Sequence, residues 1–171
     1  MTARLTVALA ALLLAASLAL TACDSSESGS RTPPAGGKPI VVFLDVQPEA
    51  KVGETIPLKL IVRNVSDRRV ELALGGQESD GFAASKDFVA VSLADQKEVW
   101  RWSHGKGVDG ILGSKTLEPG EELALQGEWD QRDNQGRAVA PGSYLVRGAF
   151  REGDPGVRTL ETEPVTLSIS R

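Results

Sequence analysis

The stretch Ile56-Pro57-Leu58-Lys59-Leu60-Ile61-Val62-Arg63 alternates large aliphatic residues with other residues over most of its length. Successive side chains of a β-strand point to opposite faces, so this period of two predicts a strand that buries one face. Similar signals recur at Ile40–Val46, Val70–Leu74, Val89–Leu93, Val99–Trp102, Leu123–Trp129, Tyr144–Phe150 and Val165–Ile169. The chain is therefore predicted to fold from short strands.

Turn residues separate these strands, as in Glu118-Pro119-Gly120 and Asn64–Asp67. No segment beyond the N-terminal leader has a helical stripe of apolar residues. Seven to eight short strands at this spacing predict an all-β fold over residues 40–171, an immunoglobulin-like antiparallel β-sandwich, with a small barrel as the alternative. Tyr144 opens a late strand just after Pro141-Gly142, where such sandwiches place a tyrosine whose hydroxyl bonds back to loop backbone.

The N-terminal segment has the pattern of a lipoprotein leader. One basic residue precedes the apolar run Leu5–Leu20, and the only cysteine follows it, in Leu20-Thr21-Ala22-Cys23. We expect a signal peptide over residues 1–22, acylation of Cys23 and a flexible linker over 23–39, which is too polar to fold. The protein would then be extracytoplasmic and anchored to membrane lipid. Asp24 favours the periplasmic face of the inner membrane if the cell is Gram-negative.

The composition argues against several kinds of chemistry. The net charge is −4 and the chain has no Lys/Arg run, so we expect no nucleic-acid partner. One histidine and one cysteine do not make a zinc site. Asp130, Asp133 and Asn134 fail the calcium-loop spacing and are interpreted as a solvated turn. With no nucleophile elbow or phosphate loop, we expect neither a metal, a cofactor nor catalytic residues, and hence no enzyme.

The aromatic residues allow two interpretations. In Val99-Trp100-Arg101-Trp102, both tryptophans lie on one face of the predicted strand and Arg101 lies on the other. Trp129 belongs to a later strand. These tryptophans either pack in the core, which we favour because large aromatics are usually buried, or form an exposed platform for a partner.

A series of short motifs runs through the predicted domain: Asn64–Asp67, Lys86-Asp87-Phe88, Glu98-Val99-Trp100-Arg101-Trp102-Ser103, Leu117–Glu121, Trp129-Asp130-Gln131 and Val139–Tyr144, which includes Pro141 and Gly142. With these motifs in this order, the chain resembles the BsuPI-type family of bacterial intracellular proteinase inhibitors. Lys86 stands where the family usually has an aromatic residue. The resemblance implies an immunoglobulin-like sandwich and inhibition of serine proteases, and we interpret the signature residues Trp100, Arg101, Trp102, Ser103, Trp129, Pro141, Gly142 and Tyr144 as structural.

We therefore expect a membrane-anchored module that binds a protein partner, with a serine protease as the partner that the resemblance implies. A rigid exposed loop would serve this role, because preorganisation reduces the entropy lost on binding. The candidate binding loop is Ser103–Lys115, with Ile111 or Leu112 for an apolar pocket or Lys106 for a basic-selective one, and Gln77–Lys86 is a second candidate. The alternative function is an envelope scaffold or assembly accessory without protease inhibition.

Overall fold

The computed structural model describes residues 39–76, 82–107, 112–153 and 158–171. These belong to the compact unit Gly36–Arg171, and every residue of the hydrophobic core lies in it. The signal peptide, Cys23 and nearly all of the predicted linker lie outside the described residues. In the described ranges, no helix has the length and apolar character needed to cross a membrane.

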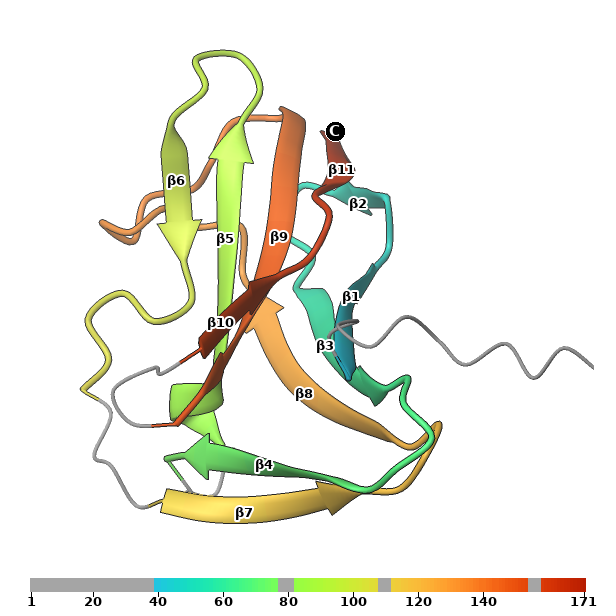
Figure 1. Cartoon of the computed structure of the whole chain (residues 1–171). Helices are drawn as coiled ribbons and strands as arrows, with labels where there is room; N and C mark the ends of the chain where they lie inside the picture. The colour runs from blue at the N-terminus through green and yellow to red at the C-terminus, as the bar shows by residue number, and fades with distance from the viewer. Residues whose placement is uncertain (1–38, 77–81, 108–111, 154–157) are drawn as a thin grey trace, which may run out of the picture. The chain divides into compact units, whose positions relative to one another are not determined.

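The described chain is built from strands, and the predicted all-β sandwich is confirmed (Figure 1). The elements are β1 (Ile40–Val46), β2 (Glu49–Lys51), β3 (Ile56–Asn64), β4 (Val70–Gly75), the 3-10 turn η1 (Ala83–Ser85), β5 (Lys86–Ser92), β6 (Glu98–Arg101), β7 (Leu112–Leu117), β8 (Glu122–Trp129), β9 (Gly142–Glu152), β10 (Arg158–Glu161) and β11 (Val165–Ser170). All eight predicted strands are present. Strands β2, β7 and β10 were not predicted from the sequence. The immunoglobulin-like class of the sandwich stays a prediction.

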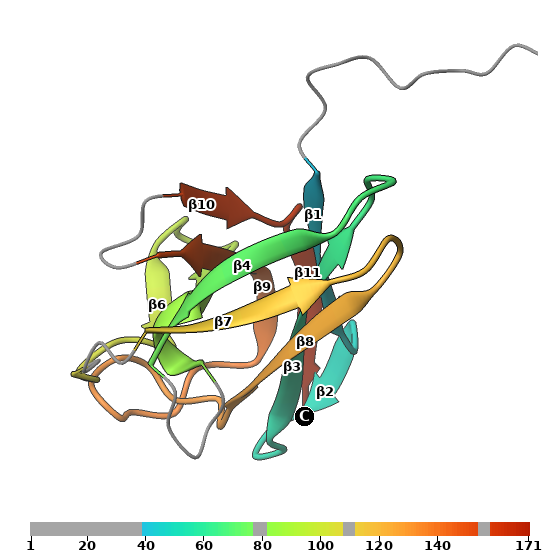
Figure 2. The same ribbon diagram turned by 60° about the horizontal axis from the view of Figure 1, so that its bottom comes forward.

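Two sheets form the layers of the domain. One has the order β1-β3-β8, and the other has the order β2-β11-β9-β5-β6 with β10 paired to β9. All pairings are antiparallel except β11 with β2, which is parallel and departs from the predicted all-antiparallel arrangement. The pair β4–β7 crosses one end of the two layers (Figure 2).

Alternation along β3 and β8 produces the core between the sheets. Leu58, Leu60 and Val62 are buried, Lys59 and Ile61 between them are partly exposed, and the flanking Pro57 and Arg63 are exposed. The layers pack closely: a Cβ added to Gly127 of β8 would lie 2.6 Å from the ring of Phe88 on β5. Burial of apolar side chains in this single core is the main stabilising contribution, at about 25 cal/mol per Å² of apolar surface.

Asn64 holds the bend between β3 and β4. Its side-chain amide donates to the carbonyls of Arg68 (2.7 Å) and Leu117 (3.0 Å), and its Oδ1 accepts the backbone N–H of Ser66 (3.0 Å). The side chain is fully buried. The turn predicted over Asn64–Asp67 is thus confirmed. It lies between the β3–β8 pair and the β4–β7 pair, and the bond from Asn64 to Leu117 connects the end of β3 to the end of β7.

Candidate functional site around the Trp100–Ser103 segment

The Trp100–Ser103 segment surrounds a buried carboxylate, Asp87 of β5. Oδ2 of Asp87 accepts hydrogen bonds from Arg101 (2.9 Å), Arg151 (2.7 Å) and the Ser103 hydroxyl (3.0 Å). Oδ1 accepts the backbone N–H groups of Ser103 (3.2 Å) and Phe88 (3.0 Å). The side chain of Asp87 is completely buried. A buried charge needs such partners, so this cluster joins β5, β6 and β9.

Arg101 connects this cluster to the surface. Its Nη2 lies 2.6 Å from Oε2 of Glu98, and its Nη1 is the group that donates to Asp87. The hydrogen bond with Glu98, followed by the bond with Asp87, raises the pKa of Arg101 above its usual value. The guanidinium therefore stays charged and takes no part in proton transfer.

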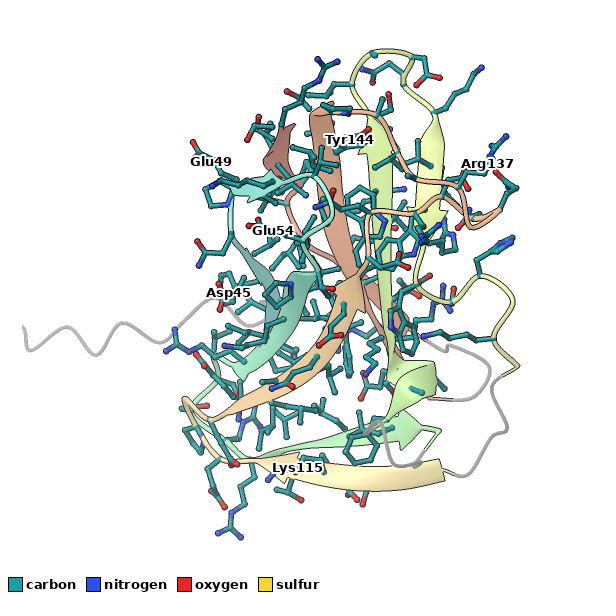
Figure 3. The ribbon with its side chains drawn as sticks, turned by 180° about the vertical axis from the view of Figure 1, so that it is seen from behind. Asp45, Glu49, Glu54, Lys115, Arg137 and Tyr144 are labelled. Atoms are coloured by element: carbon teal, nitrogen blue, oxygen red, sulfur yellow. The ribbon has the colours of Figure 1, made fainter. Side chains whose placement is uncertain are left out.

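The tryptophans belong to the core, as the favoured interpretation predicted. Trp102 is 7% exposed and Trp129 is fully buried. Trp100 is partly buried and stacks on Trp129, with ring centroids 5.6 Å apart. Trp129 meets the ring of Tyr144 edge-on at 5.5 Å, and the Tyr144 hydroxyl donates to the carbonyl of Ala140. Tyr144 lies near the start of β9, which begins at Gly142, and is labelled in Figure 3.

A short turn leaves this core at Ser103. His104 N–H donates to the Arg101 carbonyl (3.1 Å) and Lys106 N–H donates to the Ser103 carbonyl (3.2 Å). Residues 104–107 are exposed, and Nζ of Lys106 lies 3.4 Å from the centre of the Trp102 ring. Of the other candidate loop residues, Ile111 lies outside the described residues. Leu112 begins β7, and its side chain is not described. Residues 77–81, the first half of the second candidate loop Gln77–Lys86, are likewise outside them.

An open groove of about 950 Å³ lies beside this turn. Residues 123–128 of β8 line it together with parts of β1 and β3, and the groove also reaches Phe82, Lys86, Trp102 and Lys106. Lys86 is 3% exposed, and its Nζ lies 4.8 Å from the centre of the Trp102 ring. The groove is thus lined by strand β8 along its length and by Trp102 with its two lysines next to the turn.

The acidic segment after Trp129 is a turn. Oδ1 of Asp133 accepts the N–H groups of Gln135 and Arg137, both at 2.9 Å, and Oδ2 lies 2.8 Å from Nε of Arg137. The hydrogen bond from Arg137, labelled in Figure 3, is the main reason that the pKa of Asp133 is lowered. Within the described ranges, no three His, Cys, Asp or Glu side chains are placed to hold a metal ion.

Among the polar residues that the fold buries are Asp87, Lys86 and Gln131, whose burial was not predicted from the sequence. Gln131 donates to the carbonyls of Lys51 (2.7 Å) and Glu54 (2.8 Å), and its Oε1 accepts the N–H of Gly53 (3.0 Å). It thereby ties the β8–β9 connection to the turn between β2 and β3. Asp87 and Gln131 belong to motifs of the family resemblance, which indicated that the two residues matter. The motifs did not indicate which groups they bond to.

The structure thus defines a β-sandwich domain whose signature residues build a buried polar and aromatic framework under an exposed turn. The family model described as intracellular proteinase inhibitor, BsuPI, matches residues 44–154. The chain belongs to this family.

No curated protein matches the sequence. Among solved structures, the DNA-bound alkylpurine DNA glycosylase AlkC of Pseudomonas fluorescens is 15% identical with a TM-score of 0.43, over 79% of this chain and 31% of that one. A glucose-bound β-glucosidase of Listeria innocua is 13% identical (TM-score 0.39; 77% and 16%). The sporulation control protein Spo0M of Bacillus subtilis is 14% identical (TM-score 0.43; 78% and 50%). This chain therefore spans half or less of the length of each of these three proteins.

Proposed function

We propose that this protein is a non-catalytic, membrane-anchored lipoprotein whose BsuPI domain binds a protein partner and inhibits a serine protease. Family membership supports the inhibitor role. The observation that carries it is the exposed turn after Trp102, whose base is fixed by two hydrogen bonds from Ser103 to the buried Asp87.

A turn held in this way suits a protease cleft. An inhibitor gains affinity when its contact loop is ordered before binding, because less conformational entropy is lost in the complex. Lys106 is the described side chain suited to a basic-selective pocket. Its ammonium group rests on Trp102 in the free protein, and such a contact is worth about 0.5–1 kcal/mol at an exposed site. A protease that accepts Lys106 must offer a stronger interaction than this.

The experiment is an inhibition titration of the Gly36–Arg171 unit against trypsin-like and subtilisin-like proteases, followed by intact-mass analysis. We expect stoichiometric loss of activity, with the domain intact or cut once within Ser103–Lys115. Lys106→Ala should weaken inhibition of trypsin-like enzymes. Lys97→Ala is the matched control, since Lys97 is exposed on the turn between β5 and β6. Absence of inhibition at micromolar concentration, or general degradation, would refute the inhibitor role for those proteases.

The scaffold role is the alternative, and the outer face of the β1-β3-β8 sheet favours it. Phe43 is 48% exposed there and pairs across to Ile61 of β3. The ion pairs Lys59–Asp45 (3.3 Å) and Arg63–Glu122 (3.1 Å) lie on either side of these two apolar residues. Apolar surface rimmed by charge is typical of protein contacts. Phe43→Ser should leave protease inhibition unchanged and abolish envelope crosslinks if scaffolding is the function.

A further inference from the structure

Strand β1 has an open edge. It ends the sheet β1-β3-β8 and, within the described ranges, pairs only with β3 (Figure 1). The N–H of Val65 donates to the carbonyl of Pro39 (2.9 Å), and the antiparallel register continues from this pair along β1. Hydrogen-bonded pairs alternate with non-bonded pairs in such a ladder. The backbone groups of Val42 and Leu44 therefore point away from β3, toward the open edge.

This edge lacks the features with which proteins usually protect an unpaired strand, such as lysine, proline, a bulge or a covering loop. β1 reads Ile-Val-Val-Phe-Leu-Asp-Val, and its register with β3 is unbroken. Among the described residues, no backbone group of a turn or loop bonds to Val42 or Leu44. Both side chains pack against the core but stay partly exposed, and Phe43 on the outer face is 48% exposed. The edge therefore offers backbone bonds and apolar surface together.

A second copy of β1 fits this edge. Two copies related by a two-fold axis at Phe43 pair Val42 of one copy with Leu44 of the other through their outward backbone groups. Phe43 then lies opposite its own counterpart in a non-bonded pair, where Cβ atoms are about 4.5–5.5 Å apart and aromatic pairs are favourable. Because Phe43 is paired to Ile61 of β3, one apolar row would run across both copies.

The charges on the outer face also fit a second copy. In this register Asp45, the charged residue of β1, lies opposite Val41 of the other copy. That Val41 is paired to Arg63, which places Arg63 two strand spacings, or about 10 Å, from Asp45 of the first copy. By contrast, two copies of β8 paired about its middle would bring Glu122 opposite Glu128, and like charges directly opposite are destabilising. The charges therefore favour self-pairing at β1 over self-pairing at β8.

We propose that the domain forms a two-fold dimer in which β1 pairs antiparallel with β1 of a second copy, centred on Phe43. The two three-stranded sheets become one continuous sheet. The dimer goes beyond the proposed inhibitor function, and its formation requires no protease.

The proposed lipid anchor would assist this pairing. The two copies of Ile40 lie about 20 Å apart along the paired strands. The chain between Cys23 and Pro39 spans about 50 Å at most, so both anchors reach one membrane. Confinement to a membrane raises the effective concentration of each copy for the other.

The first measurement is sedimentation of the Gly36–Arg171 unit from micromolar to millimolar concentration, combined with amide hydrogen exchange. We expect a reversible equilibrium between monomer and dimer. The N–H groups of Val42 and Leu44 should become protected as the dimer forms. The N–H of Phe43, which faces β3, should be protected at every concentration.

Charge exchange at the two-fold axis tests the pairing itself. Phe43→Glu and Phe43→Lys should each weaken the dimer about tenfold or more, because two like charges would lie opposite each other. A mixture of the two variants should form a dimer again. Val52→Glu is the matched control, since Val52 is 52% exposed and lies beyond β2, outside the paired strands.

Cysteine crosslinking tests the register, because the Gly36–Arg171 unit has no cysteine of its own. Phe43→Cys should form a disulfide-linked dimer under mild oxidation, whereas Val52→Cys should not. Val41→Cys mixed with Asp45→Cys should crosslink far more than either variant does alone.

The proposal is overturned if the unit stays monomeric at millimolar concentration, or if a dimer forms without protecting Val42 and Leu44. It is also overturned if Phe43→Glu and Phe43→Lys do not pair with each other. Amide spectra show whether each variant is folded. Phe43→Glu should leave protease inhibition unchanged, so inhibition measured in parallel separates failure of this inference from failure of the inhibitor function.

Discussion

The residue that best explains the Trp-Arg-Trp-Ser segment is Asp87. Its carboxylate receives five hydrogen bonds, two of them from arginines on different strands. Arg101 and Ser103 are therefore structural ligands of this buried charge. Within the segment, Arg101 and Ser103 share Asp87 as their partner, and Trp100 stacks on Trp129.

Asp87→Ala should destabilise the domain by about 1–3 kcal/mol, because it removes the acceptor of the Phe88 and Ser103 N–H groups and the partner that Arg101 and Arg151 share. Urea unfolding followed by tryptophan fluorescence measures the change. Asp95→Ala, at an exposed turn, should have little effect by comparison. An unchanged unfolding midpoint for Asp87→Ala would contradict the structural role of the cluster.

Tyr144→Phe tests a second single contact. Loss of the hydrogen bond to the Ala140 carbonyl should cost about 1 kcal/mol near neutral pH. Burial, with a smaller contribution from Asp95, raises the pKa of the Tyr144 hydroxyl above its ordinary value. The folded state therefore holds this proton more tightly than the unfolded state. The corresponding stability is complete below about pH 10 and is lost as the pH rises through the higher folded-state pKa.

The measurement is the unfolding free energy of both proteins between neutral and strongly alkaline pH. The wild type should lose its advantage over Tyr144→Phe as this hydroxyl ionises. A difference that stays constant over this range would show that the tyrosine proton is not linked to folding.

Whether a contact between two residues can be predicted from the sequence depends on how far apart the two residues lie in the chain. The bond of Tyr144 to Ala140 and the bond of Asn64 to Ser66 join groups only a few residues apart, and turn chemistry predicts both, whereas the bond of Asn64 to Leu117 spans 53 residues. The partners Arg101 and Arg151 lie 14 and 64 residues from Asp87. The residues next to Asp87 in the chain do not indicate these contacts. The Trp-Arg-Trp-Ser motif could therefore be recognised from the sequence, but the central role of Asp87 could not.

At the scale of the element, the close approach of β8 to β5 depends on Gly127. An added methyl group would meet the Phe88 ring at 2.6 Å, so Gly127→Ala should destabilise the domain by about 1–3 kcal/mol through overpacking. Gly107→Ala is the control, because an added Cβ there has no neighbour within 4 Å. Thermal unfolding compares the two, and equal midpoints would show that the layers separate without cost.

Strands were predictable where alternation was strong. β3 and β8 repeat buried and exposed positions along their length, whereas β10 has one buried residue, Leu160, and β2 has only three residues. β7 has leucine only at its two ends. These three strands are specified by their partners β9, β11 and β4, and a signal confined to their own residues is too weak to predict them.

At the scale of the whole molecule, the proposed anchor gives a direct prediction. Cys23→Ser should abolish incorporation of a labelled fatty acid and leave a precursor that keeps residues 1–22, because the acylated thiol is the proposed processing site. Fatty-acid labelling and intact mass measure both effects. Asp24→Asn, which keeps the cysteine, should remain labelled. A label that persists in Cys23→Ser would refute the lipoprotein assignment.

The position at which the chain enters the domain determines how the domain responds to a pulling force. The carbonyl of Pro39 accepts the N–H of Val65 (2.9 Å), Ile40 is buried, and β1 pairs with β3 from Ile40 through Val46. Tension applied through Pro39 therefore reaches the β1–β3 ladder first. A pull along β1 shears all its bonds together, whereas a pull across the strand opens them one after another. The mechanical strength of the domain should therefore depend on the direction of the force.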